Sequence, residues 1–203
     1  AERSRTREID SLTDAFNHML TQIERSESRL RAQMGRLSLL QHITSAIGDR
    51  QDLPSIFQVV LRSVEENLPI DFGCFCLHEG ANDTLTVKAV GAASQPLAAT
   101  LGLTEHTSLP IDPNGLSRCM HGQLVYEPDV RDVPFPFPQR LADGGLRSLV
   151  IAPLSVESNV FGAFISARRE PHAFTSADCE FLKQLSEHVA LAAHQAQLYN
   201  ALQ

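Results

Sequence analysis

Apolar residues recur from Ile9 to Ile47 at the spacing of a heptad repeat. With Ile9 at position a, the a and d positions hold Ile9, Leu12, Phe16, Met19, Ile23, Ser26, Leu30, Gln33, Leu37, Leu40, Thr44 and Ile47. Because one helix cannot bury such a seam alone, the pattern predicts a long helix that pairs with a second helix. We expect a homodimer whose interface includes Ile9, Leu12, Phe16, Met19, Ile23, Leu30, Leu37 and Leu40.

Hydrophobic periodicity in the rest of the chain predicts an alternation of helices and strands. Helices are expected at 53–68, behind an Asp52 cap, and at 97–101, 115–121 and 176–202, the last with a Thr175/Asp178 capping box. Strands are expected at 70–78, 84–93, 108–111, 124–126, 146–155 and 159–168, with a long loop over 127–145. This order predicts an α+β fold in which one antiparallel sheet has helices on one face and loops on the other.

Composition and charge narrow the function classes. The 203 residues carry a net charge of −7 without a basic stripe, which argues against nucleic acid as a partner. No window is apolar enough to span a bilayer, no secretory signal is present, and four cysteines are too few for a disulfide framework. The chain lacks an initiator Met and both ends fall in helical patterns, so we expect a piece of a longer protein.

The opening helix carries a family resemblance as well as a heptad pattern. Glu8-Ile9, Leu12 and Ala15-Phe16-Asn17-x-Met19 resemble the second helix of a HAMP domain, the dimeric relay behind a membrane helix in bacterial receptors. Arg7 and Asp10 depart from that pattern, and a generic coiled coil is the alternative. The resemblance implies a parallel homodimer, an upstream membrane helix, and a cytoplasmic segment of an inner-membrane-anchored receptor. It assigns 1–25 to the HAMP helix and 26–48 to a coiled-coil signalling helix.

Residues 39–203 contain a series of motifs in a fixed order, which are Pro69-Ile70-Asp71-Phe72-Gly73, Leu109-Pro110-Ile111, Gly115-Leu116, Val125 to Asp132, Leu146 to Leu154, Phe161 to Ile165 and Phe174-Thr175. In this order and spacing the motifs resemble a GAF domain, a small-molecule sensing fold of signalling proteins. The resemblance implies that a ligand sits between the sheet and the loops of residues 97–147. The fold alone does not name that ligand.

Three known GAF activities match the sequence poorly. The cyclic-nucleotide signature is incomplete at Ala167-Arg168, Phe174 and Asp178-Cys179, where its Asn and Glu are missing. Bilin attachment usually needs His directly after Cys, whereas Cys119-Met120-His121 places these two side chains on different sides of a helix. The free methionine sulfoxide reductases use two cysteines, and the matching positions here are Ser117 and Ala142.

The cysteines leave a metal or redox alternative open. Cys74, Cys76 and His78 share one face of a predicted strand, yet buried strand cysteines usually behave as small hydrophobes. No second ligand pair of diagnostic spacing follows, so we predict no cofactor and no metal site. Metal, haem or redox sensing through Cys74, Cys76 or Cys119 is kept as an alternative.

The candidate ligand-binding residues all lie within residues 97–147. They are Tyr126, Phe135, Phe137, Arg140 and Cys119. Two aromatics and a guanidinium suit a small anionic or aromatic molecule. No residue supplies kinase chemistry, and no catalytic residue is predicted. The combination of a HAMP end, a signalling helix and a GAF domain resembles the cytoplasmic sensory region of a bacterial two-component sensor histidine kinase, and we expect that function. The alternatives are a ligand-free dimerisation spacer, a redox or metal sensor, and the input region of a diguanylate cyclase.

Overall fold

The computed structural model describes residues 2–48, 50, 52–79 and 82–201, with side chains from Arg7 onward. Its residues divide into two compact units, 1–42 and 43–203. Helix α1 (Glu2–Gly48) is continuous over 47 residues, which confirms the long opening helix that the heptad pattern predicts. In the described part of the chain, none of the helices combines the length and apolar character that crossing a bilayer requires.

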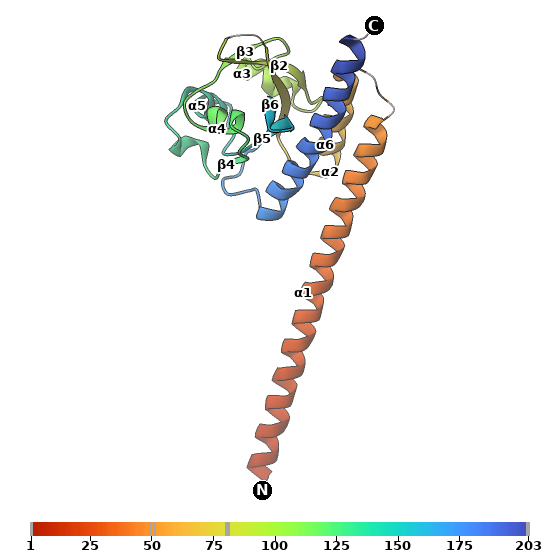
Figure 1. Ribbon diagram of the computed structural model, residues 1–203. Coiled ribbons are helices and arrows are strands. Elements are labelled where there is room, and N and C mark those ends of the chain that lie inside the picture. The colour runs from red at the N-terminus through yellow and green to blue at the C-terminus, as the bar shows by residue number, and fades with distance from the viewer. Residues whose placement is uncertain (1, 49, 51, 80–81, 202–203) are drawn as a thin grey trace. The chain divides into compact units, whose positions relative to one another are not determined.

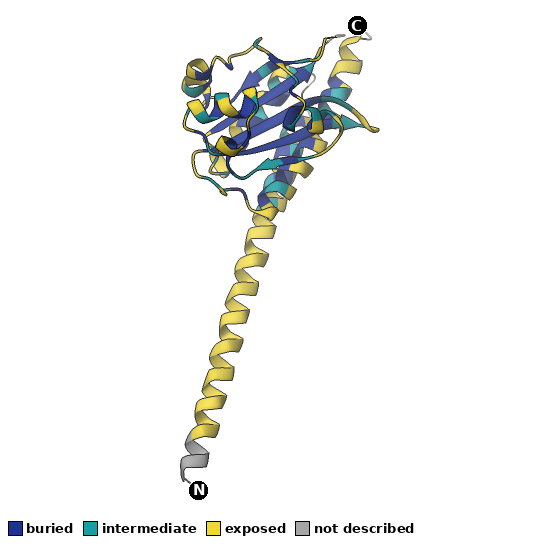
Figure 2. Cartoon of the chain, turned by 90° about the vertical axis from the view of Figure 1, so that its left-hand side faces the viewer, coloured by how far each residue is buried: buried dark blue, intermediate teal, exposed yellow. Residues whose placement is uncertain are grey.

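The residues of α1 are exposed over most of its length (Figure 2), and they include most of its apolar residues. Leu12 is 74 % exposed and Phe16 is 59 % exposed, and the same holds for Ile9, Met19, Ile23, Leu30 and Leu37. Leu40 differs, since it is only 7 % exposed within the single chain. Ile43 and Ile47, at the end of the same helix, are core residues of the second unit.

The second unit is built on one antiparallel sheet of six strands (Figure 1). The strands are β1 (Phe72–His78), β2 (Thr84–Val90), β3 (Ser108–Pro110), β4 (Val125–Glu127), β5 (Ser148–Val156) and β6 (Asn159–Arg168), in the spatial order β3-β2-β1-β6-β5-β4. The longest pairing is the β5–β6 hairpin, where Glu157 and Ser158 take positive φ angles of 49° and 68°. Such angles are those of a two-residue hairpin turn. The predicted α+β fold is confirmed.

Two long helices cover one side of the sheet, which we call the helix face. These are α2 (Leu53–Asn67) and α6 (Ser176–Ala201). Phe75 of β1 stacks between Phe57 of α2 and Phe164 of β6, with ring centroids 4.5 Å apart in both pairs. Both helices begin as predicted. Asp52 accepts from the Ser55 N–H, and the capping box joins the Thr175 and Asp178 backbones to each other's side chains.

Three short helices cover the opposite side, which we call the pocket face. They are α3 (Gln95–Leu101), α4 (Gly115–Met120) and α5 (Pro136–Asp143). Their apolar residues, including Leu101, Leu116 and Phe137, pack with Cys74 and Ile151 of the sheet into one buried cluster. Most of the space between sheet and covering helices is therefore filled by side chains.

The long loop predicted over 127–145 is wrong in part. It contains a 3-10 turn, η1 (Val130–Asp132), and the helix α5. Pro136 and Pro138 suggested an irregular segment, but both lie in the first turn of α5. Proline is tolerated there, because the N–H groups of a first turn have no helical acceptor.

Candidate functional site

A pocket of about 260 Å³ opens on the pocket face, between β3, the start of α4 and α5. Its walls are mostly apolar, and its two charged members come from different elements. The lining residues are Leu109, Pro110, Asp112, Pro113, Pro136, Phe137 and Arg140. An apolar cleft with a few convergent polar groups is the usual form of a small-molecule site.

Arg140 is held in place by the end of α3. Its Nε donates to the Leu101 carbonyl at 2.6 Å and its Nη2 donates to the Gly102 carbonyl at 2.7 Å. Gly102 has a φ of 63°, and a Cβ at this position would lie 2.7 Å from Arg140 Nη2. Glycine therefore suits the left-handed turn, and a larger residue here would displace the guanidinium from its position. The positive charge also suits the negative end of a helix.

Asp112 is the second charged residue of the pocket and is only 8 % exposed. Its Oδ1 accepts from the Asn114 N–H at 3.1 Å. Its Oδ2 is buried, and no residue in the described part of the chain donates a hydrogen bond to it. In the sequence Asp112 precedes the helix expected at 115–121, where an acidic residue usually has a capping role, so the residue pattern alone does not indicate a site. A buried acceptor without a donor is an unusual feature that calls for a functional explanation.

A second acidic group, Glu127, lies near Asp112. Burial raises the pKa of Glu127, the charge of Arg118 acts against that rise, and the negative charge of Asp112 adds to it. Arg118 Nη1 lies 3.8 Å from Glu127 Oε1. Glu127 of β4 is thus paired with Arg118 of α4, whereas Asp112 and Arg140 are the charged residues that line the pocket.

The structure brings only two of the five predicted ligand residues together. Phe137 and Arg140 line the pocket. Phe135 is the N-cap residue of α5 and lies outside the pocket lining. Tyr126 lies on the helix face, where its ring meets Phe174 edge-on at 6.3 Å. Because Val125 points into the pocket-face core, the next residue of the strand must point the opposite way.

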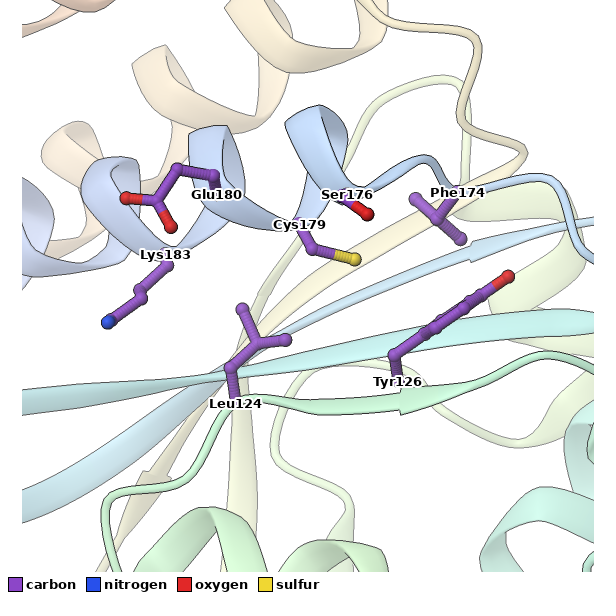
Figure 3. Close-up of a pocket in the computed structure, with 7 residues that line it drawn as sticks. All are labelled: Leu124, Tyr126, Phe174, Ser176, Cys179, Glu180 and Lys183. Atoms are coloured by element: carbon purple, nitrogen blue, oxygen red, sulfur yellow. The ribbon is translucent and has the colours of Figure 1, made fainter.

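Tyr126 instead belongs to a separate pocket of about 310 Å³, at the start of α6 (Figure 3). Cys179 points toward the space between Leu124 and Tyr126, and Lys183 lies beyond them along the helix. Burial raises the pKa of both Tyr126 and Cys179, so their protonated forms are favoured.

The strand cysteines lie side by side, as predicted, with their Sγ atoms 4.0 Å apart. The contact with Cys74 and burial raise the pKa of Cys76. Burial also raises the pKa of Cys119 to about 12, and Cys119 has no exposed surface. Neutral, enclosed thiols are poor nucleophiles and poor metal ligands. Across the described residues, no group of three or more His, Cys, Asp or Glu side chains is arranged to hold a metal ion.

Two further sequence patterns find structural explanations. His121 is exposed, and its Nδ1 lies 2.7 Å from the Ser117 carbonyl, whereas Cys119 is buried, so the two do not face a common ligand. Asp178 both caps α6 and pairs with the buried Arg168, whose guanidinium carbon lies 4.2 Å from the centre of the Phe174 ring. Asp178, Arg168 and Phe174 therefore have structural roles on the helix face.

Comparison with known proteins identifies the second unit. The family model described as GAF domain matches residues 50–194. The chain belongs to the GAF family. The chain is 25 % identical over 177 residues, 81 % of its length, to the circadian input-output histidine kinase CikA of Thermosynechococcus vestitus. It spans about a quarter of the length of that relative, 24 %.

Solved GAF-type structures share the fold at low identity. The GAF domain of a phosphoenolpyruvate-protein phosphotransferase from Coxiella burnetii has a TM-score of 0.69, with 16 % identity over 83 % of this chain and 98 % of that one. The free methionine-R-sulfoxide reductase of Neisseria meningitidis, in complex with its substrate, has a TM-score of 0.67. It is 16 % identical over 81 % of this chain and 91 % of that one. At these identities the likeness shows the fold alone.

Proposed function

We propose that this chain is the sensory and signal-transmitting region of a bacterial two-component sensor histidine kinase. In this proposal the end of a HAMP relay and a signalling helix, both on α1, lead into the GAF domain. The observation that carries the proposal is the exposed heptad seam of α1, which runs from Ile9 to Leu37 and is followed by a GAF domain. The similarity to a histidine kinase supports a kinase as the domain that receives the signal.

The exposed seam supports a parallel homodimer. A row of leucine, isoleucine, phenylalanine and methionine side chains at a and d positions is stabilised when a second copy covers it. Both copies enter from the same side if α1 continues a membrane helix, as the HAMP resemblance implies. In that arrangement the region is cytoplasmic and belongs to a membrane-anchored receptor.

Signalling then consists of a shift between two packings of the paired helices. A ligand contributes only if it binds one packing more tightly than the other. The pocket bounded by Asp112, Phe137 and Arg140 is the proposed ligand site. A change there can pass through the sheet to α2 and α6, since both faces pack on the same strands.

A ligand-free spacer is the second candidate function. Phe137 is 5 % exposed and Met120 packs against the buried cluster, so the pocket-face core is largely filled. In a spacer the GAF domain would only hold the paired helices in register. The two candidates share the dimer and differ in whether occupation of the pocket matters.

Sedimentation velocity tests the dimer on which both candidates depend. At about 20–50 µM, a concentration suited to micromolar association, the wild-type chain is expected to sediment as a dimer. Phe16→Asp places a charge in the seam and is expected to yield monomer. The matched variant Ser11→Asp adds the same charge at position c, outside the seam, and is expected to stay dimeric. A monomeric wild type, or a Phe16→Asp variant as dimeric as the wild type, contradicts the proposal.

A further inference from the structure

The pocket on the pocket face contains one negative and one positive group on otherwise apolar walls. Asp112 supplies the carboxylate and Arg140 the guanidinium, while Leu109, Phe137 and three prolines supply the apolar surface. A ligand with only a negative charge would be repelled by Asp112, and one with only a positive charge would be repelled by Arg140. The pair of charges is therefore complementary to a zwitterion.

Asp112 indicates where the donor of that ligand would lie. Its side chain is more than nine-tenths buried and lines the pocket, and Oδ1 is already used by the Asn114 N–H. Oδ2 receives no hydrogen bond from any described residue. Oδ2 itself has almost no accessible surface, so it is the carboxylate as a whole, and not this atom, that borders the pocket. A buried carboxylate with an unsatisfied oxygen costs free energy, and a small rotation of the side chain against a bound ammonium group would remove that cost. An ammonium supplies up to three donors and a compensating charge.

Arg140 indicates where the acceptor of the ligand would lie. Its guanidinium has five N–H donors, and Nε and Nη2 each direct one to the carbonyls at the end of α3. These two bonds fix the plane of the guanidinium before any ligand arrives. A pre-positioned guanidinium binds a carboxylate more strongly than a mobile one, because less side-chain entropy is lost.

The size and walls of the pocket limit the rest of the ligand. About 260 Å³ lies below the roughly 300–1,000 Å³ typical of sites for drug-sized molecules. The space is too small for a tetrapyrrole or a dinucleotide. Phe137 and the prolines offer contacts to an aliphatic or aromatic side chain.

We propose that this pocket binds a free α-amino acid with an apolar side chain. The ammonium group lies against the carboxylate of Asp112, the carboxylate lies on Arg140, and the side chain packs on Phe137. This inference rests on the proposed sensory function and names the class of its ligand. It does not depend on the dimer, so binding and association are tested separately.

Calorimetric titration of the full chain tests the inference with L-leucine, L-methionine and L-phenylalanine. Isoamylamine and 4-methylpentanoate serve as matched probes, because they keep the leucine side chain and lack the carboxylate and the ammonium respectively. At least one of the three amino acids is expected to bind below about 5 mM, near the weak end of measurable affinity. Each matched probe is expected to bind at least about tenfold more weakly than leucine, or not at all, because it loses one charge-assisted contact.

Asp112→Asn is the decisive variant. Its amide oxygen can still accept from the Asn114 N–H, while the negative charge of the carboxylate is lost. Its affinity for the bound amino acid is expected to fall at least about tenfold, with thermal unfolding close to that of the wild type. Asp143→Asn removes the same charge from the exposed end of α5 and is expected to leave affinity unchanged. The inference is overturned if none of the three amino acids binds, if Asp112→Asn binds as tightly as wild type, or if leucine binds and either matched probe binds as tightly as leucine. The sedimentation result stands in each of these cases.

Discussion

Glu65 of α2 accepts two hydrogen bonds from Ser94, from its backbone N–H at 3.1 Å and from its hydroxyl at 2.7 Å. The hydroxyl oxygen of Ser94 also accepts from the Gly73 N–H at the start of β1. Since Ser94 is the residue before α3, this contact joins a helix of the helix face to a helix of the pocket face around the end of the sheet. It is a direct connection between the proposed ligand side and the proposed signalling side.

Glu65→Gln is expected to destabilise the domain by about 1–3 kcal/mol, because one of the buried donors loses its acceptor. Glu65 also accepts from the Ala93 N–H, so a single amide oxygen cannot replace both carboxylate oxygens. Urea unfolding measures the change. The neighbouring Glu66→Gln, which affects only an exposed pair with Arg62, is the control and is expected to change stability by less than about 0.5 kcal/mol. Equal effects of the two variants would show that the connection is not structurally important.

The start of α6 is expected to respond differently to two neighbouring substitutions. Thr175→Ala removes one half of the capping box and is expected to cost about 0.5–2 kcal/mol. Asp178→Ala removes the other half and also leaves Arg168 without its anion in the core, which is expected to cost about 3–5 kcal/mol. Thermal and urea unfolding of the two variants provide the comparison. A Thr175→Ala cost as large as that of Asp178→Ala would contradict the importance of the buried pair.

Asp129 is expected to make stability fall in acid. Hydrogen bonds from Arg147, followed by those from Arg131, hold the pKa of Asp129 well below its usual range. A carboxyl whose pKa is lower in the folded chain contributes stability above its unfolded pKa of about 3.9 and loses it as pH falls further. The stability advantage of wild type over Asp129→Asn is therefore expected to be full above about pH 5 and to shrink below about pH 4.

Urea unfolding of both proteins at pH 7, 4 and 3 gives the free energy of unfolding of each. The difference between the two proteins is compared at each pH. An advantage that stays constant across these pH values would show that Asp129 titrates alike in the folded and unfolded chain. An advantage that grows in acid would show that folding raises the pKa of Asp129 and does not lower it.

Local signals in the sequence were sufficient for most of the fold. The Asp52 cap and the Thr175/Asp178 box are short-range hydrogen-bond patterns, so their residues alone locate the ends of α2 and α6. The helix α5 was missed because Pro136 indicates a loop and the beginning of a helix equally well. The burial of Ile43 and Ile47 in the second unit depends on tertiary packing, which a heptad pattern does not contain.

The candidate site was less predictable, because it depends on which residues meet across the sheet. Phe137 and Arg140 were identified from residue type within one segment. Tyr126 was assigned to the same site although strand alternation after Val125 directs it to the helix face. Asp112 was overlooked because a carboxylate before a helix usually has a capping role, and only packing shows that its second oxygen is buried without a donor.

The central claim is that α1 pairs with α1 of a second copy in parallel and in register. Met19→Cys places a thiol at a d position that is 56 % exposed in the single chain. In a parallel dimer the two thiols face each other across the seam. Thr21→Cys, at the outward f position two residues away, is the matched control. Mild oxidation followed by non-reducing electrophoresis is expected to yield a covalent dimer of Met19→Cys and little of Thr21→Cys. Equal cross-linking of the two variants, or none of Met19→Cys, would contradict the parallel seam.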